Sequence, residues 1–258
     1  MSAVTTARPS TRAAVLDRAT AMHLAATEYG RFADLLRTLR PDDWTRPTEC
    51  SAWDVRAMAG HALGMAQMVA ALPAFVAQNA GAARAGGGID ALTSLQVRKT
   101  AQLSPDELVE KFRVVGPRAV RGRRRLARAL GRLPLPEVQV VGGQQERWTF
   151  GFLFDVVLTR DTWMHRVDLC RAVGRPMTLT ADHDGRIVAD VVREWAQRHG
   201  KPYAVELTGV AGGVFASQGT AFGNTAYGHI VIDAVEFCRM LSGRGPAGTG
   251  LLAQPVPF

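Results

Sequence analysis

Apolar residues near the start of the chain recur at alternating intervals of three and four positions. They are Val15, Ala19, Met22, Ala26, Tyr29, Ala33 and Leu36. Because such intervals place side chains on one face of a helix, they predict a long amphipathic helix from about Thr11 to Leu39. A stretch that contains Pro41 and two aspartates follows, and it predicts the end of that helix.

A second helical pattern begins after Ser51, where the serine hydroxyl and Asp54, three residues later, predict a capped helix start. Its inner face comprises Val55, Met58, His61 or Ala62, Met65, Val69 and Leu72. His61 therefore shares a face that packs inward, where a histidine is either a hydrogen-bonded core residue or a ligand. The apolar stretch 57–76 is interrupted by His61, Gln67 and Pro73, so it is interpreted as a buried helix and not as a membrane span.

Glycine and proline divide the middle of the chain. Residues 80–88 are small and glycine-rich, which predicts a flexible loop that is either a plain connector or a lid. Ser104, Pro105 and the two acids that follow predict the start of a third helix. Pro117 and the glycine before it predict a bend or break in that helix, and residues 134–143 are expected to form a loop.

A fourth helix is predicted from about Arg147 to Val173, with Gly174 and Pro176 as its stop signal. Its inward stripe consists of Phe154, Leu158, Asp161, His165, Asp168 and Ala172. Three polar side chains thus occupy positions where core residues are expected, and buried polar groups need partners. Two interpretations fit: neighbours that hydrogen-bond to these groups, or a metal ion that uses the carboxylate and the imidazole together.

Beyond Pro176 the pattern changes to shorter elements. A helix over 181–199, strands over 203–210, 213–217 and 230–232, and a final helix capped by Asp233 and ending near Leu241 are predicted. The predicted fold is α+β: an antiparallel four-helix bundle over residues 10–176, followed by a small α/β domain over residues 177–258. Bundles often build metal sites from side chains on facing helices.

Composition narrows the class of protein. The net charge of +8 rests mostly on arginine, and seven arginines crowd one helix at positions 118, 121, 123, 124, 125, 128 and 132. No aromatic residues interleave with them, so a solvated helix face is expected and no specific nucleic-acid binding. Walker and dinucleotide glycine motifs are absent from the sequence.

The cysteines and the N-terminus indicate where the protein works. Cys50, Cys170 and Cys238 are far apart and odd in number, which argues against a disulfide framework and favours a reducing cytoplasm. Packing is the expected role of each. The first ten residues lack a basic stretch followed by an apolar one, so no signal peptide is expected.

Three sequence blocks together resemble the mycothiol-dependent maleylpyruvate isomerase-like proteins, a family of the DinB-like metal-binding bundles. The blocks are Trp44-x-x-Pro47-Thr48-x-Cys50-x-x-Trp53-Asp54-Val55 leading to His61, Asp161-x-x-x-His165-Arg166-x-Asp168-Leu169 leading to Pro176, and the tail from Asp233 to Arg244. The resemblance implies that His61, Asp161 and His165 are ligands of a divalent metal. The acid of the family is often glutamate, so aspartate at this position is one carbon shorter.

The resemblance also implies a C-terminal domain similar in topology to sterol carrier proteins, which can add an arginine to the site. Arg239 and Arg244 are candidates, and neither is assigned. Asp168 is the candidate catalytic residue, as support for an imidazole, although an ion pair with Arg166 or Arg171 is equally compatible with the sequence.

The resemblance implies a metal-dependent transferase or isomerase that uses mycothiol, a low-molecular-weight thiol, on a small electrophilic molecule. Three nitrogen and oxygen ligands with an open fourth position are typical of catalytic zinc, so zinc is the expected ion. Two alternatives stay open. One is a metallohydrolase that uses no thiol, and the other is a non-catalytic protein that binds a small ligand in its C-terminal domain. The sequence does not predict an oligomeric state.

Overall fold

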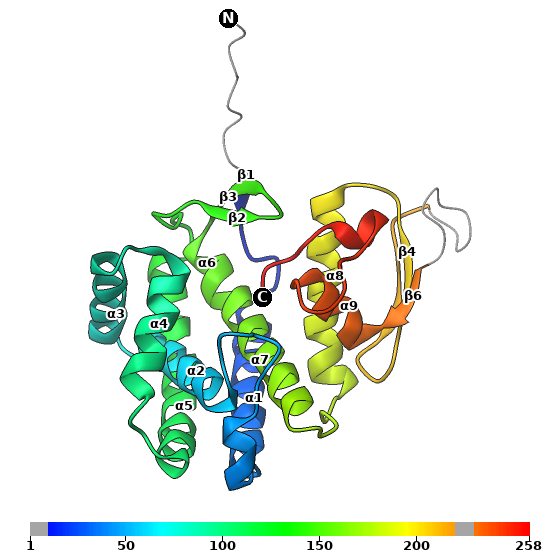
Figure 1. Ribbon diagram of the computed structural model, residues 1–258. Helices are drawn as coiled ribbons and strands as arrows, with labels where there is room; N and C mark the ends of the chain where they lie inside the picture. The colour runs from blue at the N-terminus through cyan, green and yellow to red at the C-terminus, as the bar shows by residue number, and fades with distance from the viewer. Residues whose placement is uncertain (1–9, 220–229) are drawn as a thin grey trace, which may run out of the picture.

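The computed structural model describes residues 10–219 and 230–258 and has the predicted α+β fold (Figure 1). The bundle is built on α1 (Arg18–Arg37), α2 (Val55–Ala70), α5 (Pro105–Leu130) and α7 (Leu158–Ala172). The C-terminal part contains a small sheet and two helices, and it lies beside α1 and α7. The predicted boundary at residue 176 falls in the segment that follows α7. The expectation that no signal peptide is present concerns residues 1–10, and most of these lie outside the described residues.

The first helix begins later than predicted. Asp17 is its N-cap and accepts a hydrogen bond from the amide of Thr20, so the helix starts at Arg18 and not near Thr11. Residues before this cap form β1 (Ser10–Arg12), which pairs in parallel with β3 (Gln144–Trp148). β3 also pairs with β2 (Gln139–Val141), so part of the loop predicted over 134–143 is a strand. After α1 comes a short 3₁₀ turn, Pro41–Thr45.

The helix that carries His61 starts at Val55 because Asp54, and not Ser51, is its cap. The Asp54 carboxylate accepts from the amide of Ala57 at 2.7 Å. The stretch 57–76 is two helices and not one: α2 ends at Ala70, and α3 (Leu72–Arg84) begins with Pro73 in its first turn. Proline is favoured there because its missing amide hydrogen has no intrahelical partner in any case.

The prediction of a loop over residues 80–88 is wrong for most of that stretch. α3 continues to Arg84 and α4 (Gly88–Thr100) follows, so only residues 85–87 lie between the helices. Gly86 and Gly87 adopt φ angles of +107° and +78°, which residues other than glycine rarely adopt. The two glycines therefore allow the tight turn between α3 and α4. The many alanines and glycines of this stretch give no clear hydrophobic periodicity in the sequence. In the structure, α3 and α4 pack against α2 through buried residues such as Ala82 and Leu92.

The predicted start of α5 is confirmed. The hydroxyl of Ser104 accepts from the amide of Glu107 at 3.2 Å, and the carboxylate of Glu107 accepts from the amide of Ser104 at 2.7 Å. The helix is not split at Pro117 and runs unbroken to Leu130. Gly116 lets α1 approach, since a Cβ there would lie 3.2 Å from the Cβ of Tyr29.

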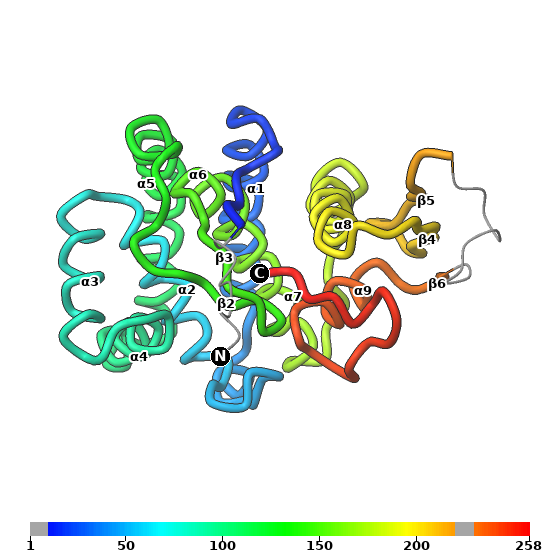
Figure 2. The backbone as a smooth tube through the Cα atoms, turned by 90° about the horizontal axis from the view of Figure 1, so that it is seen from above, coloured from blue at the N-terminus to red at the C-terminus, as the bar shows by residue number. Residues whose placement is uncertain are grey.

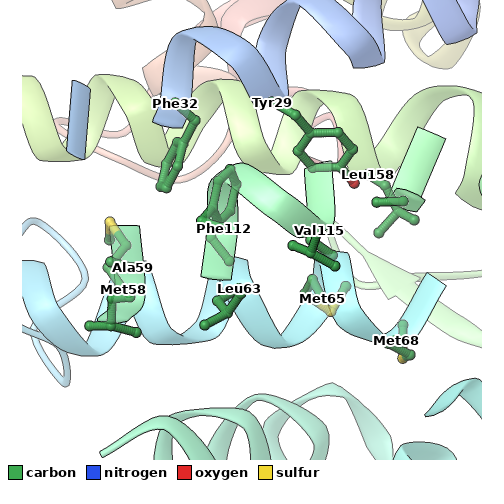
Figure 3. Packing of buried hydrophobic residues seen from close by; sticks show 14 of the residues in the cluster. Tyr29, Phe32, Met58, Ala59, Leu63, Met65, Met68, Phe112, Val115 and Leu158 are labelled. Atoms are coloured by element: carbon green, nitrogen blue, oxygen red, sulfur yellow. The ribbon is translucent and has the colours of Figure 1, made fainter. Parts of the chain in front are cut away.

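The bundle core lies between α1, α2 and α5, as Figure 3 shows for Phe32, Leu63 and Phe112. The rings of Phe32 and Phe112 are 4.9 Å apart between centroids, and both side chains are fully buried. Each such side chain contributes about 1.5–3 kcal/mol through burial. Tightly packed helices of this kind give the rigid frame on which polar side chains can be held in fixed positions.

We expect Gly122→Ala to destabilise the bundle by about 1–3 kcal/mol or more through overpacking. A Cβ at Gly122 on α5 would lie 1.8 Å from the main-chain oxygen of Val69 on α2, and backbone atoms have little room to move away. Urea unfolding measures the effect. Gly30→Ala is the matched control, because Gly30 is also helical but has no atom within 4 Å of the added Cβ. That variant should gain about 0.5–1 kcal/mol, and equal effects of the two substitutions would contradict the packing argument.

The fourth long helix contains an irregularity just before its polar residues. It begins as α6 (Phe150–Phe152), passes through the π-helical turn Leu153–Val157 and continues as α7. The amide of Leu158 bonds to the carbonyl of Leu153 in place of that of Phe154, and the Phe154 carbonyl accepts from Arg123 Nε at 2.7 Å. Arg123 is fully buried, so the expectation of a solvated arginine face is wrong at this position, although the six other arginines are exposed.

The C-terminal part follows the predicted order. After the π-helical turn Ala181–Gly185 come α8 (Arg186–His199), β4 (Ala204–Thr208), β5 (Gly213–Ala216), β6 (Ile230–Asp233) and α9 (Ala234–Leu241), and then the 3₁₀ turn Gly250–Ala253. The strand order is β5-β4-β6, with β4 parallel to β6 and antiparallel to β5 (Figure 2). Asp233 caps α9 as predicted. No helix in the described ranges is both long enough and apolar enough to cross a membrane.

A second core joins this part to the bundle. Trp163 and Val167 on α7 and Leu24 on α1 pack among buried residues of α8 and α9, such as Trp195 and Phe237. α7 therefore has two buried sides, which explains why twelve of its fifteen residues are buried. Side chains on α7 can thus meet residues from both halves of the chain.

Candidate metal centre

His61, Asp161 and His165 come together between α2 and α7. Asp161 Oδ1 lies 3.9 Å from His61 Nε2 and 3.3 Å from His165 Nε2, and one ligand atom of each residue lies within 4.8 Å of the others. The two imidazole rings are perpendicular, with centroids 5.2 Å apart. The His61 and His165 side chains are 3% and 5% exposed, whereas that of Asp161 is 18% exposed, so the group opens to solvent on the aspartate side.

Local structure explains this meeting. His61 lies in the buried middle of α2, and the four-residue spacing of Asp161 and His165 places both on one face of α7. Each imidazole uses its Nδ1 atom elsewhere. His61 Nδ1 lies 2.8 Å from Gln96 Oε1 on α4, and His165 Nδ1 lies 3.2 Å from Asp168 Oδ2 one turn further along α7.

Asp168 is held from the C-terminal half of the chain. Arg244 Nε donates to both of its carboxylate oxygens, at 2.8 and 3.0 Å, and Asp168 is fully buried. Its ion-pair partner is therefore Arg244, and not Arg166 or Arg171 as the sequence suggested. Arg239, the other candidate, is 4% exposed and pairs with Glu49 and Glu236, so it is not an ordinary surface charge.

The loop before α2 covers the two histidines. The amide and the hydroxyl of Thr48 both donate to the carbonyl of Trp53, and the hydroxyl also lies 3.2 Å from the carbonyl of Cys50, which closes residues 48–53 into a compact turn. The Trp53 indole then lies over His61, with ring centroids 4.9 Å apart and planes tilted by 34°, and meets His165 at 6.0 Å. The turn explains the threonine of the first sequence block, and the ring contact explains its tryptophan.

The charges of the cluster favour a cation at its centre. Burial alone would raise the pKa of Asp161, but the neighbouring His165 lowers it well below its usual range. Burial alone would lower the pKa of His165, but the charge and hydrogen bond of Asp161, with Asp168 behind the ring, raise it to about 9. In both cases the site favours positive charge between the imidazole Nε2 and the carboxylate.

The residues present fit a divalent ion. His61 Nε2, His165 Nε2 and Asp161 Oδ1 face one another, while both Nδ1 atoms face oxygen acceptors. A neutral imidazole that donates its Nδ1 proton carries a lone pair on Nε2. Two lone pairs and an anionic oxygen therefore converge once a metal replaces the proton that His165 otherwise holds on Nε2. Two imidazoles and a carboxylate form a donor set that suits zinc and related transition metals.

The cysteines do not add a nucleophile to this centre. Cys50 is half-buried, and its Sγ atom lies 3.7 Å from Arg244 Nη2 and 4.0 Å from Asp168 Oδ2. Burial raises the pKa of Cys50 despite the nearby Arg244, so the thiol form is favoured at neutral pH. Cys170 and Cys238 are buried, and burial raises the pKa of both. Within the described residues all three are unpaired thiols.

A cluster of Glu28, His183 and Asp184 also brings potential ligands together, but arginines already supply its cations. Arg166 donates to both oxygens of Glu28, at 2.7 and 3.0 Å, and to Asp184 Oδ1 at 2.7 Å. Arg31 donates to Asp184 Oδ2 at 2.5 Å. Because these guanidinium groups occupy the carboxylate oxygens, we interpret this cluster as an ion network that ties α1 and α7 to the turn before α8.

Asp184 should make stability fall in acid. Burial alone would raise the pKa of Asp184, but Arg166 and hydrogen bonds from the Thr180 amide and Trp163 lower it. A carboxyl whose pKa is lowered on folding stabilises the protein above the unfolded value of about 3.9, and this contribution is lost as the pH falls toward the folded value. Asp184→Asn should therefore show a shallower loss of unfolding free energy between pH 5 and pH 3.

Urea unfolding at each pH measures this slope, and Asp34→Asn is the control, since Asp34 lies on the exposed face of α1. If the unfolding free energy of Asp184→Asn fell with pH as steeply as that of the wild type, Asp184 would have the same pKa in the folded and the unfolded protein.

Two residues of the site escaped the sequence analysis. Gln96 lies on α4, in a stretch for which no element was predicted, and Gln78 lies on α3, between the predicted buried helix and the predicted loop. Both are buried, at 1% and 6% exposure, but polar neighbours such as Asn79 and Arg98 left no sequence signal that marks either glutamine as buried.

Fold and site together define a helical-bundle protein with an α+β C-terminal extension and a buried group of two histidines and an aspartate between its helices. Residues 25–170 match the family described as the mycothiol maleylpyruvate isomerase N-terminal domain. That match covers more than half of the chain, so the protein belongs to this family, as the sequence blocks suggested.

Two solved structures share the fold. A crystal structure of the mycothiol-dependent maleylpyruvate isomerase is 15% identical, with 94% of this chain and 98% of that chain covered and a TM-score of 0.54. A crystal structure of a mutant of that isomerase is also 15% identical, with the same coverage and a TM-score of 0.50. No curated protein sequence gives a significant match to the chain. At this identity the likeness establishes the common fold.

Proposed function

We propose that the protein is a metal-dependent enzyme that uses mycothiol to isomerise, or to transfer the thiol to, a small electrophilic molecule. The observation that carries the proposal is the convergence of His61 Nε2, His165 Nε2 and Asp161 Oδ1 on one point that opens to solvent. Membership of the mycothiol maleylpyruvate isomerase family supports the thiol. In this proposal the three residues are the metal ligands and Asp168 is a positioning residue.

A divalent ion held by these residues would act as a Lewis acid that lowers the pKa of a thiol, whose ordinary value is about 8.5. The chain supplies the rest of the site. Asp168 holds the ring of His165 through Nδ1, and Arg244 neutralises the buried Asp168 carboxylate. Trp53 covers the face of His61 and meets His165 in an edge contact, which limits the access of water to both rings, so access is left on the side of Asp161.

Arg244 gives the C-terminal part a role in the proposed reaction. It follows α9 in the chain and reaches Asp168 on α7, so the position of His165 depends on both halves of the protein. Arg244→Met should leave Asp168 as an unpaired buried charge and lower zinc affinity by about 10–100-fold. Arg239→Met, which removes a nearby arginine that pairs with Glu49, is the control and should retain wild-type zinc affinity.

Cobalt(II) substitution tests the proposed function. The cobalt-loaded protein should show a visible spectrum typical of a tetrahedral site, and added mycothiol should add a thiolate-to-cobalt charge-transfer band. Isomerisation of maleylpyruvate should then require both the metal and mycothiol. A cobalt spectrum that mycothiol leaves unchanged would contradict the thiol role.

The alternatives give different results in the same experiments. Turnover of an ester or amide by the metal-loaded protein at a rate independent of thiol would favour the metallohydrolase. A binding protein would keep its affinity for an apolar ligand after His165→Ala, because its site would lie in the C-terminal part and need no metal.

A further inference from the structure

Two buried glutamines stand in line behind His61. Gln78 on α3 and Gln96 on α4 are 6% and 1% exposed, and their side chains link the main chain of α2 to the imidazole. Amide groups buried this deeply cost free energy unless they are hydrogen-bonded, and each amide has one donating and one accepting end. Once one group in this series of hydrogen bonds is known to be a donor or an acceptor, the donor and the acceptor of every other bond in the series are determined as well.

That member is the carbonyl oxygen of Gly64, which can only accept. Gln78 Nε2 lies 3.1 Å from it and must donate, so Gln78 Oε1 is the accepting end. Gln96 Nε2 lies 2.9 Å from Gln78 Oε1 and donates in turn, which directs Gln96 Oε1 toward His61 Nδ1 at 2.8 Å. Because Gln96 Oε1 can only accept, His61 must carry its proton on Nδ1.

We propose that Gln78 and Gln96 are positioning residues that fix the Nδ1–H tautomer of His61 and direct its Nε2 lone pair toward Asp161. In water the Nε2–H tautomer of a neutral histidine is the commoner one, so the protein must favour the other form. The consequence for metal binding rests on the proposed function, whereas the tautomer itself does not.

Glycines on α2 make this arrangement possible. A Cβ at Gly64 would lie 2.5 Å from Cγ of Gln96, and a Cβ at Gly60 would lie 2.3 Å from the Thr100 hydroxyl. These two positions, four residues apart, let α4 approach α2 closely enough for a glutamine to reach the histidine. The same contacts keep Gln96 in place, with Met65 Sδ as a further neighbour at 3.1 Å from its Nε2.

The test is ¹⁵N NMR on the full chain after metal has been removed by chelation, at a pH where the His61 ring is neutral. Two-bond couplings show which ring nitrogen carries the proton. Wild type should show the Nδ1–H form of His61, and Gln96→Leu should shift it toward Nε2–H. Gln96→Glu keeps an acceptor for Nδ1–H, although it loses the donor to Gln78, and it should retain the wild-type tautomer.

Thr100→Val is the matched control, because Thr100 lies one turn along α4 in the same interface and its hydroxyl bonds only to carbonyls of α4 among the described residues. It should leave the tautomer unchanged. Zinc affinity, measured by competition with a chelator, should fall by about 10–100-fold in Gln96→Leu and little in Gln96→Glu.

An unchanged tautomer in a folded Gln96→Leu variant would overturn the inference, and so would a shifted tautomer with unchanged zinc affinity. If wild type binds no zinc, the proposed function fails, and the tautomer measurement alone decides whether the glutamines position His61. Should Gln96→Leu not fold, Gln78→Leu replaces it, since loss of the Gln78 acceptor frees the Gln96 amide to turn and present its nitrogen to His61.

Discussion

His165→Ala is expected to reduce bound zinc from about one ion per chain to a trace. The loss of zinc affinity should exceed the roughly 10–100-fold that is typical when a residue hydrogen-bonded to a metal ligand is replaced. His165 supplies one of three converging donor atoms, and it also connects Asp161 to the Asp168 and Arg244 pair. His61→Ala should have the same effect from the other helix. Elemental analysis after dialysis against zinc measures both.

The matched control is His23→Ala, which removes an exposed histidine of α1. It should bind zinc as wild type does. Retention of full zinc by both His61→Ala and His165→Ala would show that the metal lies elsewhere. Asp161→Glu should still bind zinc, because glutamate offers the same carboxylate on a longer side chain, whereas Asp161→Asn should bind it more weakly through the loss of charge.

The second large effect is expected from the buried ion network. Arg166→Met removes the guanidinium that bonds to both oxygens of Glu28 and to Asp184, and it leaves buried negative charge without its main partner. Removal of one member of such a pair typically costs about 3–5 kcal/mol. Unfolding in urea should therefore show a large loss of stability, and α1 and α7 should separate more easily from the turn before α8.

Arg113→Met serves as the control, because Arg113 forms an exposed pair with Glu110 on α5. Exposed pairs contribute little to stability, so this variant should unfold like wild type. The double variant Glu28→Leu with Arg166→Met should recover part of the loss, since the Glu28 charge is then removed together with that of Arg166, while Asp184 keeps its ion pair with Arg31. A single Arg166→Met variant as stable as wild type would contradict the role given to the network.

The sequence predicted those features that depend on neighbouring residues. The capped start of α5 at Ser104, the cap of α9 at Asp233 and the placement of Asp161 and His165 on one helix face follow from residues within four positions of one another. The α+β order followed from the change in pattern after Pro176. The two caps and the placement of Asp161 and His165 are fixed within about one turn of a helix, which is why a single sequence is sufficient to find them.

Features that depend on distant residues were missed. No helix was predicted over α4, because its glycine-rich start gives no helical period, and Gln96 was therefore missing from the predicted site. Arg123 was assigned to a solvated face, although the π-helical turn provides it with a carbonyl partner. Arg244 could not be chosen over Arg239, because only the tertiary fold brings it to Asp168.

The most direct test of the central claim is anomalous diffraction at the zinc absorption edge from crystals of the zinc-loaded protein. The proposed function predicts one strong anomalous peak per chain, within bonding distance of His61 Nε2, His165 Nε2 and an Asp161 oxygen, with a coordination position open toward solvent. A peak at the cluster of Glu28, His183 and Asp184, or no peak near α2 and α7 at saturating zinc, would contradict it.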